Sequence, residues 1–560
     1  MKITGAEAVI ECLLKEHVTT IFGYPGGANM PIYDALYKYQ KKINHILVRH
    51  EQGATHAAEG YSRVTGKPGV CFATSGPGAT NLVTGIADAM MDSIPMVCVT
   101  GQVAANLLGS DAFQETDVIG ITAPITKWNF QITKTSEIPE AFAKAFYIAS
   151  HGRPGPVVLD IVKSCQFDMM EFKYPKKVQI LKFERRKVLN KKAIKKASEI
   201  INRAKKPYIL SGHGVLIANA TEDLKNFAVK IGAPVAVTLH GISSIPCNHP
   251  QYIGMLGMHG NFSPNVLTNE ADVIVAIGMR FDDRVTGKLS QYAPKAKIIH
   301  IDVDPSEHHK NIRAYLAIAG DAKKVLQKLN KQVKSNTHKE WMQQFKELDK
   351  KEFEAHERRN ATKNGKIRMD EVFQMLSKKT KGNAIIVADV GQNQMFAARH
   401  YQYTNPNSYI TSGGLGTMGF ALPAAIGAKI GSPKSEVIAT IGDGGFQMTI
   451  QELGTIMQEK LPVKIIVLNN HFLGMVRQWQ QLFFDKRYSF TTMVSPDFVA
   501  LVKSYGISAQ KITKRNEMDK EMQKMLNSKS AYFLEIDVEN EDNIFPMMTA
   551  GSAVDEMRLE

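Results

Sequence analysis

The clearest feature of the hydrophobic pattern is a pair of short runs rich in isoleucine and valine. Residues 436–441 and 463–468 are each bounded by glycine, proline or asparagine, which is typical of strands buried on both faces. A helical segment lies between the two runs. The pattern therefore predicts a unit of strand, glycine turn, helix and strand, in which the two strands run parallel.

The same alternation of strand and helix patterns recurs along the whole chain. It predicts an α/β protein with three doubly wound, Rossmann-like domains built on parallel sheets. A chain of 560 residues is also too long for one hydrophobic core. We expect an N-terminal domain at 1–165, a central domain at 190–335, a C-terminal domain at 366–545 and a polar C-terminal tail at 546–560 suited to a mobile lid.

Polar side chains follow both strands of the first unit. Asp443 lies in the turn Gly442-Asp443-Gly444, and Asn470 comes directly after the second strand. Because parallel strands end at the same edge of a sheet, we expect the two side chains to lie close together. Carboxylate and amide oxygens suit magnesium, and glycines at a helix N-terminus suit a diphosphate. A structural turn with an asparagine cap is the alternative.

The first domain contains a faint copy of this unit. The distance in sequence from the glycine turn to the proline that leads the next strand is nearly the same for Gly76 to Pro95 as for Gly442 to Pro462. Upstream of the first copy, Glu51 lies where a strand meets a helix. A glutamate there often compensates the helix dipole, but two related units also suit one cofactor held by a diphosphate site and an acid.

Net charge, hydrophobicity and cysteine usage narrow the classes of function that this chain could have. The formal net charge of +15 arises partly from a basic stretch at 173–196, which has no aromatic platform or nucleic-acid motif. We expect a solvated linker or a docking face for an acidic partner there, and no nucleic acid. No run approaches the roughly 20 apolar residues of a membrane span. The five cysteines are scattered along the chain and odd in number, which indicates a reducing, cytoplasmic location. They are Cys12, Cys71, Cys98, Cys165 and Cys247.

The central domain has a strand that ends in acids, Asp302 and Asp304. Acids at strand ends of such domains bind ribose or adenine groups, which favours a nucleotide-binding domain. A degenerate Rossmann-like domain that binds no ligand is the alternative. A charged helical pattern at 336–364 is expected to connect this domain to the next one.

The glycine turn followed by Asn469-Asn470 resembles the diphosphate motif of thiamine-diphosphate enzymes. Nearly the whole chain resembles the FAD-containing acetohydroxyacid synthases, through YPGGANMPIYDAL, RHEQGATHAAEGYSR, TSGPGATN, AFQETD, MRFDDRVTG, HIDVDP, GGLGTMGFALPAAIGA, GDGGFQM and LGMVRQWQQLFF. The resemblance implies decarboxylation of pyruvate on thiamine diphosphate and condensation with pyruvate or 2-ketobutyrate. It also implies a homodimer or dimer of dimers, an active site between subunits, and a small regulatory subunit.

The resemblance further implies the residues of the thiamine site. Glu51 would bond to the aminopyrimidine ring, while Met418 and the Gly416 carbonyl would hold the bent cofactor. Asp443, the Asn470 side chain and the Phe472 carbonyl would bind Mg²⁺. The remaining implied contacts to this cofactor are Gly442, Gly444, Gly445 and Met475.

For the substrates, the resemblance implies Gly27 and Gln114 beside the reacting carbon and Arg284 at the carboxylate of the second ketoacid. Trp479 would select 2-ketobutyrate, and Lys163 matches a position that contacts inhibitors. The implied FAD contacts are Arg153, Met258, His259, Gly260, Arg280, Asp302, Asp304 and Asp321.

The chain departs from the family pattern at residues 161–166, at Gly445, where serine is commoner, and in the tail, which lacks a proline pair. A thiamine- and FAD-dependent pyruvate oxidase is the alternative enzyme. A binding protein without catalysis is the other alternative, and it would require the loss of Glu51, Asp443 or Asn470, all of which are present.

Overall fold

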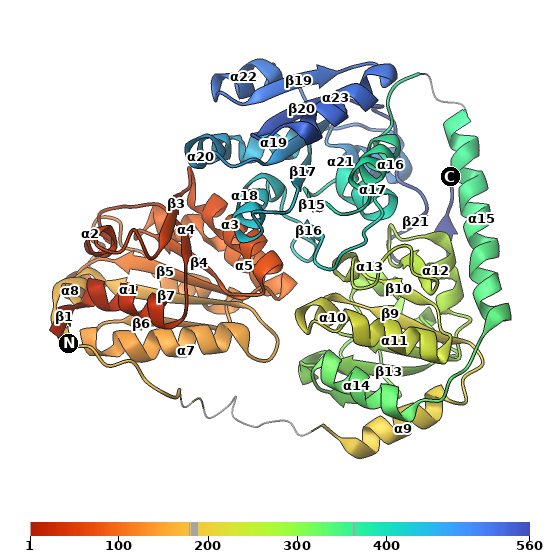
Figure 1. Ribbon diagram of the computed structural model, residues 1–560, viewed down its shortest axis with the longest axis horizontal. Helices are drawn as coiled ribbons and strands as arrows, with labels where there is room; N and C mark the ends of the chain where they lie inside the picture. Colours follow the sequence, from red (N-terminus) through yellow and green to blue (C-terminus); the bar gives the residue numbers. More distant parts are fainter. Residues whose placement is uncertain (1, 179, 181–188, 362–364) are drawn as a thin grey trace.

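The protein contains three six-stranded sheets, each covered by helices on both faces (Figure 1). This computed structural model describes residues 2–178, 180, 189–361 and 365–560. Neighbouring strands within these sheets run parallel. The predicted α/β class with three doubly wound units is therefore confirmed.

The N-terminal sheet has the strand order β3-β2-β4-β5-β7-β6. Its first helix begins after Thr4, whose side chain and that of Glu7 form a capping box. The strands are β2 (Thr20–Gly23), β3 (Asn44–Leu47), β4 (Gly69–Ala73), β5 (Met96–Gln102), β6 (Trp128–Ile132) and β7 (Pro156–Val162). The helices are α1 (Gly5–Lys15), α2 (Met30–Tyr37), α3 (Glu51–Thr65), α4 (Pro77–Asn81), α5 (Val83–Asp92), α6 (Val118–Thr122), α7 (Ile138–Ser150) and α8 (Lys163–Phe167).

The C-terminal sheet has the order β16-β15-β17-β18-β20-β19. When the strands of each sheet are numbered along the chain, both terminal sheets have the strand order 2-1-3-4-6-5. The two domains that share the similar sequence spacing therefore also share one sheet topology. The strands are β15 (Ile385–Ala388), β16 (Tyr409–Thr411), β17 (Val437–Gly442), β18 (Lys464–Asn469), β19 (Ser508–Ile512) and β20 (Tyr532–Asp537). The helices are α16 (Met369–Thr380), α17 (Gln392–His400), α18 (Ala421–Gly431), α19 (Asp443–Met448), α20 (Leu453–Glu459), α21 (Gly474–Phe483), α22 (Phe498–Ser504) and α23 (Arg515–Asn527).

The central sheet differs from the other two. Its order, β11-β10-β9-β12-β13-β14, is 3-2-1-4-5-6 along the chain, which is the order of dinucleotide-binding Rossmann domains. The strands are β9 (Pro207–Ser211), β10 (Val235–Val237), β11 (Tyr252–Met255), β12 (Val273–Ile277), β13 (Lys297–Asp302) and β14 (Leu316–Ala319). The helices are α9 (Lys191–Ile201), α10 (His213–Ile217), α11 (Thr221–Ile231), α12 (Phe262–Thr268), α13 (Asp283–Thr286) and α14 (Ala322–Gln332).

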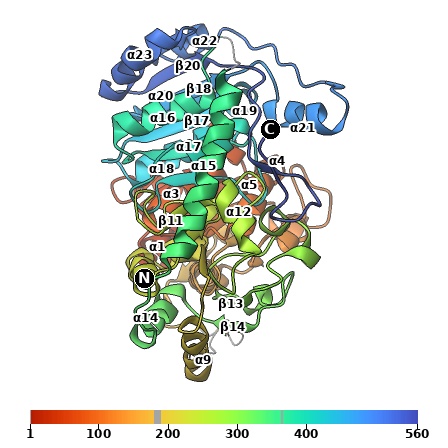
Figure 2. The ribbon, with the colours of Figure 1, turned by 90° about the vertical axis from the view of Figure 1, so that its right-hand side faces the viewer.

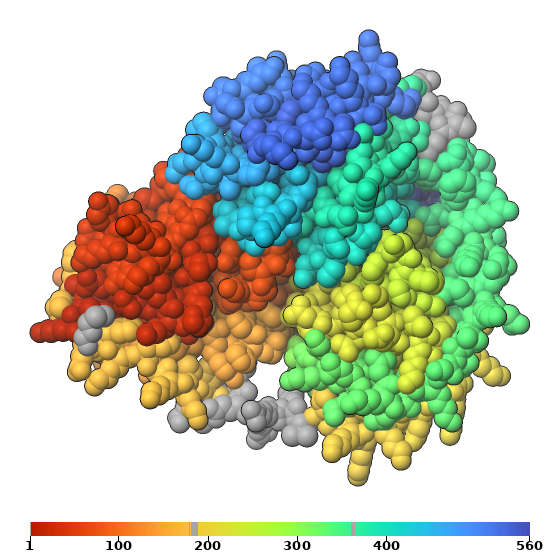
Figure 3. Space-filling model, viewed as in Figure 1, coloured from red at the N-terminus to blue at the C-terminus, as the bar shows by residue number. Residues whose placement is uncertain are grey.

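Helices α3 and α18 join the two terminal domains, and they lie side by side in both ribbon views (Figures 1 and 2). A Cβ atom on Gly60 would lie 1.9 Å from the Ala424 carbonyl oxygen, and one on Gly427 would lie 1.7 Å from that of Ala57. The two glycines therefore allow the helix backbones to touch. One hydrophobic core runs through this contact from the first sheet to the last, and the space-filling view shows the domains in contact (Figure 3).

The connecting segments only partly match the sequence predictions. Helix α15 (Lys339–Ala361) forms most of the charged connector that we predicted at 336–364. Positions 362–364 of that connector lie outside the described residues. Arg185, Arg186 and Lys187 of the basic stretch also lie outside them. No helix in the described part of the chain is long and apolar enough to cross a membrane.

The C-terminal tail, which we expected to be polar, contains buried apolar residues. It forms a small antiparallel sheet of β21 (Met547–Met548) and β22 (Met557–Arg558). Met548 and Val554 are buried in the hydrophobic core of the central domain. The sequence pattern concealed this burial, because the apolar residues of the tail are separated by polar ones; that the tail acts as a mobile lid stays a prediction.

Candidate active site

A large cavity is lined by residues of all three domains. Its volume is about 1810 Å³, and its lining includes Arg153, Arg284 and Asp443. Sites for one small ligand usually measure about 300–1,000 Å³. The cavity therefore has room for more than one cofactor.

Asp443 and Asn470 are brought together as the sequence predicted. β17 and β18 are hydrogen-bonded parallel neighbours, and both residues line the cavity at the ends of these strands. Asp443 is only 1% exposed, and its Oδ2 atom has no hydrogen-bond partner. Burial raises the pKa of Asp443 to about 7. A buried carboxylate oxygen without a partner fits a cation, and oxygen ligands of this kind suit Mg²⁺.

Asn470 is held in a fixed orientation. Its Nδ2 donates to Gln392 Oε1 (3.1 Å), and its Oδ1 accepts from the Phe472 backbone N–H (3.2 Å). Gln392 is held in turn, because its Nε2 donates to Gln478 Oε1 at 3.2 Å. Sequence reasoning missed this supporting role of Gln392 and Gln478, because the two glutamines lie in separate helical patterns.

Two of the glycines near Asp443, Gly444 and Gly445, have close neighbours where a side chain would begin. A Cβ atom on Gly444 would lie 2.9 Å from Leu473 Cδ2, and one on Gly445 would lie 2.4 Å from Asp389 Oδ1. The Asp389 carboxylate thus gives a physical reason for glycine at position 445. Gly442, Gly444 and Gly445 all line the cavity, which keeps the backbone at the start of α19 accessible to a ligand.

The loop between β16 and α18 supplies the opposite wall, with Gly416 and Met418 lining the cavity. Gly416 adopts a φ of +76°, a conformation that side chains disfavour. Met418 reaches toward the glycine turn, since its Cε atom lies 3.5 Å from the Cβ position of Gly444. Met418, a predicted contact to the thiamine ring, therefore faces the predicted diphosphate site, and Gly416 lines the same cavity.

Arg284 and Trp479 also line the cavity, together with Met475. Arg284 Nη1 lies 3.0 Å from Met258 Sδ, and within the described part of the chain no carboxylate pairs with Arg284. Its guanidinium is therefore available to an anionic ligand. Trp479 is half-buried and packs edge to face against Phe483 at 5.6 Å between ring centroids.

Most of the predicted FAD contacts line the central-domain part of the cavity. They are Arg153, Met258, His259, Arg280, Asp302 and Asp321. Burial raises the pKa of Asp302 to about 6 and lowers that of His259 to about 3, so His259 is neutral. Asp321 also caps α14 by accepting from the Lys324 N–H at 2.9 Å.

Two predicted FAD residues lie outside the cavity lining, Gly260 and Asp304. Gly260 is enclosed by backbone, because a Cβ atom there would lie 2.5 Å from the Met255 carbonyl oxygen. Asp304 accepts from the Ser306 N–H at 3.0 Å and lies 3.7 Å from Arg153 Nη1. Both residues lie in turns beside residues that line the cavity, and their contact with FAD stays a prediction.

Four predicted residues of the N-terminal domain form a separate group. Gly27, Glu51, Gln114 and Lys163 do not line the cavity of their own chain. They follow β2, β3, β5 and β7, and thus gather at the carboxyl edge of that sheet. Glu51 begins α3, and its Oε2 accepts from Asn81 Nδ2 at 2.9 Å.

Three family models match the chain in order. They describe the N-terminal TPP binding domain, the central domain and the C-terminal TPP binding domain of thiamine pyrophosphate enzymes, and they match residues 3–121, 194–329 and 389–536. These ranges fall within the three sheet-containing units described above.

Curated relatives match over the whole chain. The acetolactate synthase large subunit of Buchnera aphidicola subsp. Schizaphis graminum is 46% identical, covering 100% of this chain and 98% of the relative. The isozyme 2 large subunit of Escherichia coli K12 is 43% identical, with 99% of each chain covered. A probable acetolactate synthase large subunit of Methanocaldococcus jannaschii is 46% identical, covering 98% and 94%. The chain belongs to the acetolactate synthase large-subunit family of thiamine pyrophosphate enzymes.

Proposed function

We propose that the protein is an acetolactate synthase that decarboxylates pyruvate and joins the two-carbon unit to pyruvate or 2-ketobutyrate. The products would be 2-acetolactate and 2-aceto-2-hydroxybutyrate, in the first common step toward valine, leucine and isoleucine. The observation that carries this proposal is the Asp443 and Asn470 pair at the three-domain cavity, in a chain of this family.

Thiamine diphosphate would supply the electron sink for decarboxylation when bound. Asp443, Asn470 Oδ1 and the Phe472 carbonyl would hold Mg²⁺, and the partnerless Asp443 Oδ2 supports this assignment. The Rossmann strand order and the cavity volume support FAD on the central-domain side.

Glu51 would hold or move a proton at the pyrimidine ring, a role that suits a carboxyl group near that ring. Glu51 lies outside the cavity of its own chain, so a second copy of the chain would present it. Gly27, Gln114 and Lys163 share its sheet edge and would arrive with it. This arrangement supports a homodimer, or a dimer of dimers, as the active form.

Arg284 would orient the second ketoacid by binding its carboxylate, for which a planar guanidinium is well suited. Its lack of a carboxylate partner in the described chain supports this role. The indole of Trp479 would contact the alkyl end of that substrate. Water exclusion by the apolar part of the wall, including Met418 and Met475, would strengthen these polar contacts.

Each of the three domains would bind a different part of the cofactors. Residues 1–165 would bind the pyrimidine of a partner's cofactor, 190–335 would bind FAD and 366–545 would bind the diphosphate.

The relatives are named large subunits, which supports a small regulatory subunit as a partner. The five cysteines are all unpaired, which supports a reducing compartment such as the cytoplasm.

A product assay tests the proposal. Purified protein is incubated with pyruvate, with and without thiamine diphosphate, Mg²⁺ and FAD, and acetolactate and acetate are measured separately. Acetolactate formation that requires thiamine diphosphate and Mg²⁺ is expected. Acetate formation with bleaching of the flavin absorbance would instead identify a pyruvate oxidase, and no product in the complete mixture would contradict both activities.

A further inference from the structure

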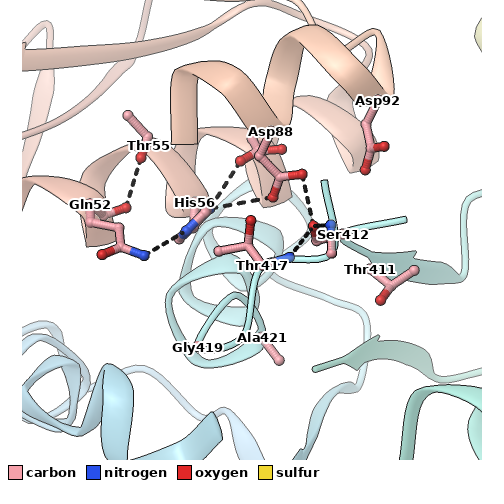
Figure 4. Close-up of polar contacts among 12 residues, drawn as sticks. Gln52, Thr55, His56, Asp88, Asp92, Thr411, Ser412, Thr417, Gly419 and Ala421 are labelled. Carbon is pink, nitrogen blue, oxygen red and sulfur yellow. Dashed lines mark hydrogen bonds and ion pairs between the residues drawn. The ribbon is translucent and has the colours of Figure 1, made fainter. Parts of the chain in front are cut away.

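The glycine-rich loop between β16 and α18 is held by buried carboxylates. The Gly419 and Ala421 N–H groups donate to Asp389, at 3.0 and 2.8 Å. The earlier part of the same loop is held from the N-terminal domain, by Asp88 and Asp92 on α5. Figure 4 shows both acids and the contact of Asp88 with Ser412. These two acids lie one helical turn apart and thus on the same face of the helix.

Asp88 acts on the loop through Ser412. The Ser412 hydroxyl donates to Asp88 Oδ1 at 2.8 Å, and its oxygen accepts the N–H groups of Gly416 (3.1 Å) and Thr417 (2.8 Å). Asp88 and Ser412 are both completely buried. The hydroxyl proton is therefore committed to Asp88, which leaves the oxygen lone pairs directed to the two amides.

Asp92 holds the start of the loop and contacts all three domains. Its carboxylate accepts the N–H groups of Gly413 (3.0 Å) and Gly414 (2.7 Å) and pairs with Arg63 Nη2 at 2.8 Å. His240 Nε2 of the central domain lies 2.9 Å from Asp92 Oδ1. Burial alone would raise the pKa of Asp92, but His240 and Arg63 lower it, so Asp92 is ionised.

Behind Asp88 lie Glu59 and His56 of α3, all fully buried. His56 Nδ1 lies 3.0 Å from Glu59 Oε1 and 3.9 Å from Asp88 Oδ2. His56 Nε2 faces Gln52 Nε2 at 3.3 Å, a contact that fits a neutral ring with its proton on Nδ1. Asp88 therefore accepts the Ser412 hydroxyl with Oδ1, while its Oδ2 atom faces His56. Burial disfavours a charge on any of these three side chains.

We propose that Asp88, acting through Ser412, is a positioning residue that fixes the Gly416 and Met418 segment in the shape presented to the cofactor cavity. Gly416 and Thr417 are adjacent to Met418, so the two amides bound by Ser412 define the path of the backbone where it turns toward the cavity. Asp92 fixes the preceding glycines independently. The value of this positioning for catalysis rests on the proposed function, while the hydrogen bonding of the loop does not.

Hydrogen exchange of the cofactor-free protein tests the positioning. In Ser412→Ala, the amides of Gly416 and Thr417 should exchange about tenfold faster, as expected for the loss of about one hydrogen bond. The amides of Gly413 and Gly414 should keep their protection. Asp88→Ala should act in the same direction, whereas Asp88→Asn keeps an oxygen acceptor and should restore the protection.

The matched control is Asp272→Ala. Asp272 also accepts two successive backbone amides, those of Lys205 (2.7 Å) and Lys206 (2.9 Å), but it lies in the central domain away from the loop. It should change exchange near those lysines and leave the loop unchanged. Unchanged exchange at Gly416 and Thr417 in both alanine variants would overturn the proposal, as would equally fast exchange in Asp88→Asn.

Titration calorimetry with thiamine diphosphate and Mg²⁺ gives the functional readout. Ser412→Ala should bind the cofactor about tenfold more weakly, because cofactor binding would then have to order a loop that has lost about one hydrogen bond. Asp88→Asn and Asp272→Ala should bind it as the wild type does. Affinity unchanged in Ser412→Ala, with exchange accelerated, would overturn the link between the loop and the cofactor. Wild-type protein that forms no acetolactate would refute the proposed function instead, without altering the exchange results.

Discussion

Asp443 and Asn470 directly follow two hydrogen-bonded parallel strands, in which Gly442 is paired with Leu468, and both residues line the same cavity. This adjacency turns two residues that are distant in sequence into one candidate metal site. Neighbouring parallel strands direct their carboxyl ends to one edge, so the arrangement follows from the crossover topology. The following predictions test this site and the residues around it.

Asp443→Asn should abolish most of the Mg²⁺-dependent affinity for thiamine diphosphate. Changes to residues that only support a metal ligand cost about 10–100-fold in affinity, so replacement of a direct ligand should cost at least about 100-fold. Titration calorimetry at several Mg²⁺ concentrations measures this loss. Asp537→Asn, at the end of the neighbouring strand β20, is the control and should bind normally. Undiminished affinity in Asp443→Asn would refute the metal assignment.

Glu51→Gln should bind thiamine diphosphate but slow proton exchange at C2 of its thiazolium ring. Loss of a general acid–base group typically costs about 10²–10⁴ in rate. NMR of deuterium exchange at C2 of the bound cofactor measures the effect directly. Glu7→Gln, at another first-turn glutamate of the same domain, should leave the exchange rate unchanged. A normal rate in Glu51→Gln would remove this residue from the reaction.

Trp479→Leu should reduce the preference for 2-ketobutyrate over pyruvate as the second substrate. The two acceptors differ by one methylene group, which an apolar contact distinguishes by about 1–3 kcal/mol, or about 10–200-fold. The measurement is the ratio of acetohydroxybutyrate to acetolactate at equal acceptor concentrations. Phe483→Leu alters the ring that packs against Trp479 without lining the cavity, and serves as the control. An unchanged ratio in Trp479→Leu would make this tryptophan a packing residue.

Asp88→Asn should change how stability depends on pH. Burial, then the nearby Glu59 and Asp92, raise the pKa of Asp88 to about 8, while His56 and the Ser412 hydroxyl act in the opposite direction. The folded state therefore favours the protonated form. This contribution to stability is fully present below the ordinary aspartate pKa of about 4 and is lost as the pH rises through about 8.

Because asparagine does not ionise, the variant lacks this loss. The unfolding midpoint of Asp88→Asn, relative to the wild type, should rise as the pH is increased from 5 to about 8.5. Denaturation of both proteins at matched pH values measures the difference, in which the titration of unrelated carboxyls cancels. A difference independent of pH would show that Asp88 is ionised in the folded protein throughout this range.

The alternation of strands and helices and the positions of the glycine turns could be predicted from the amino-acid sequence alone. Strand and helix periodicity are local properties, so runs such as 463–468 predicted β18 closely, and the acid and amide at strand ends predicted the Asp443 and Asn470 pair. The similar spacing around Gly76 and Gly442 also anticipated the shared strand order of the terminal sheets.

The contacts between side chains that are distant in sequence could not be predicted in this way and emerge only from the fold. The Ser412 contact to Asp88, the support of Asn470 by Gln392, and the burial of Met548 in the tail join segments whose local patterns carry no information about one another. Gly260 is a further case, because only the fold shows that a Cβ atom there would lie 2.5 Å from the Met255 carbonyl oxygen. Hydrogen bonds and packing of this kind depend on the relative placement of whole domains, which periodicity along the chain does not encode.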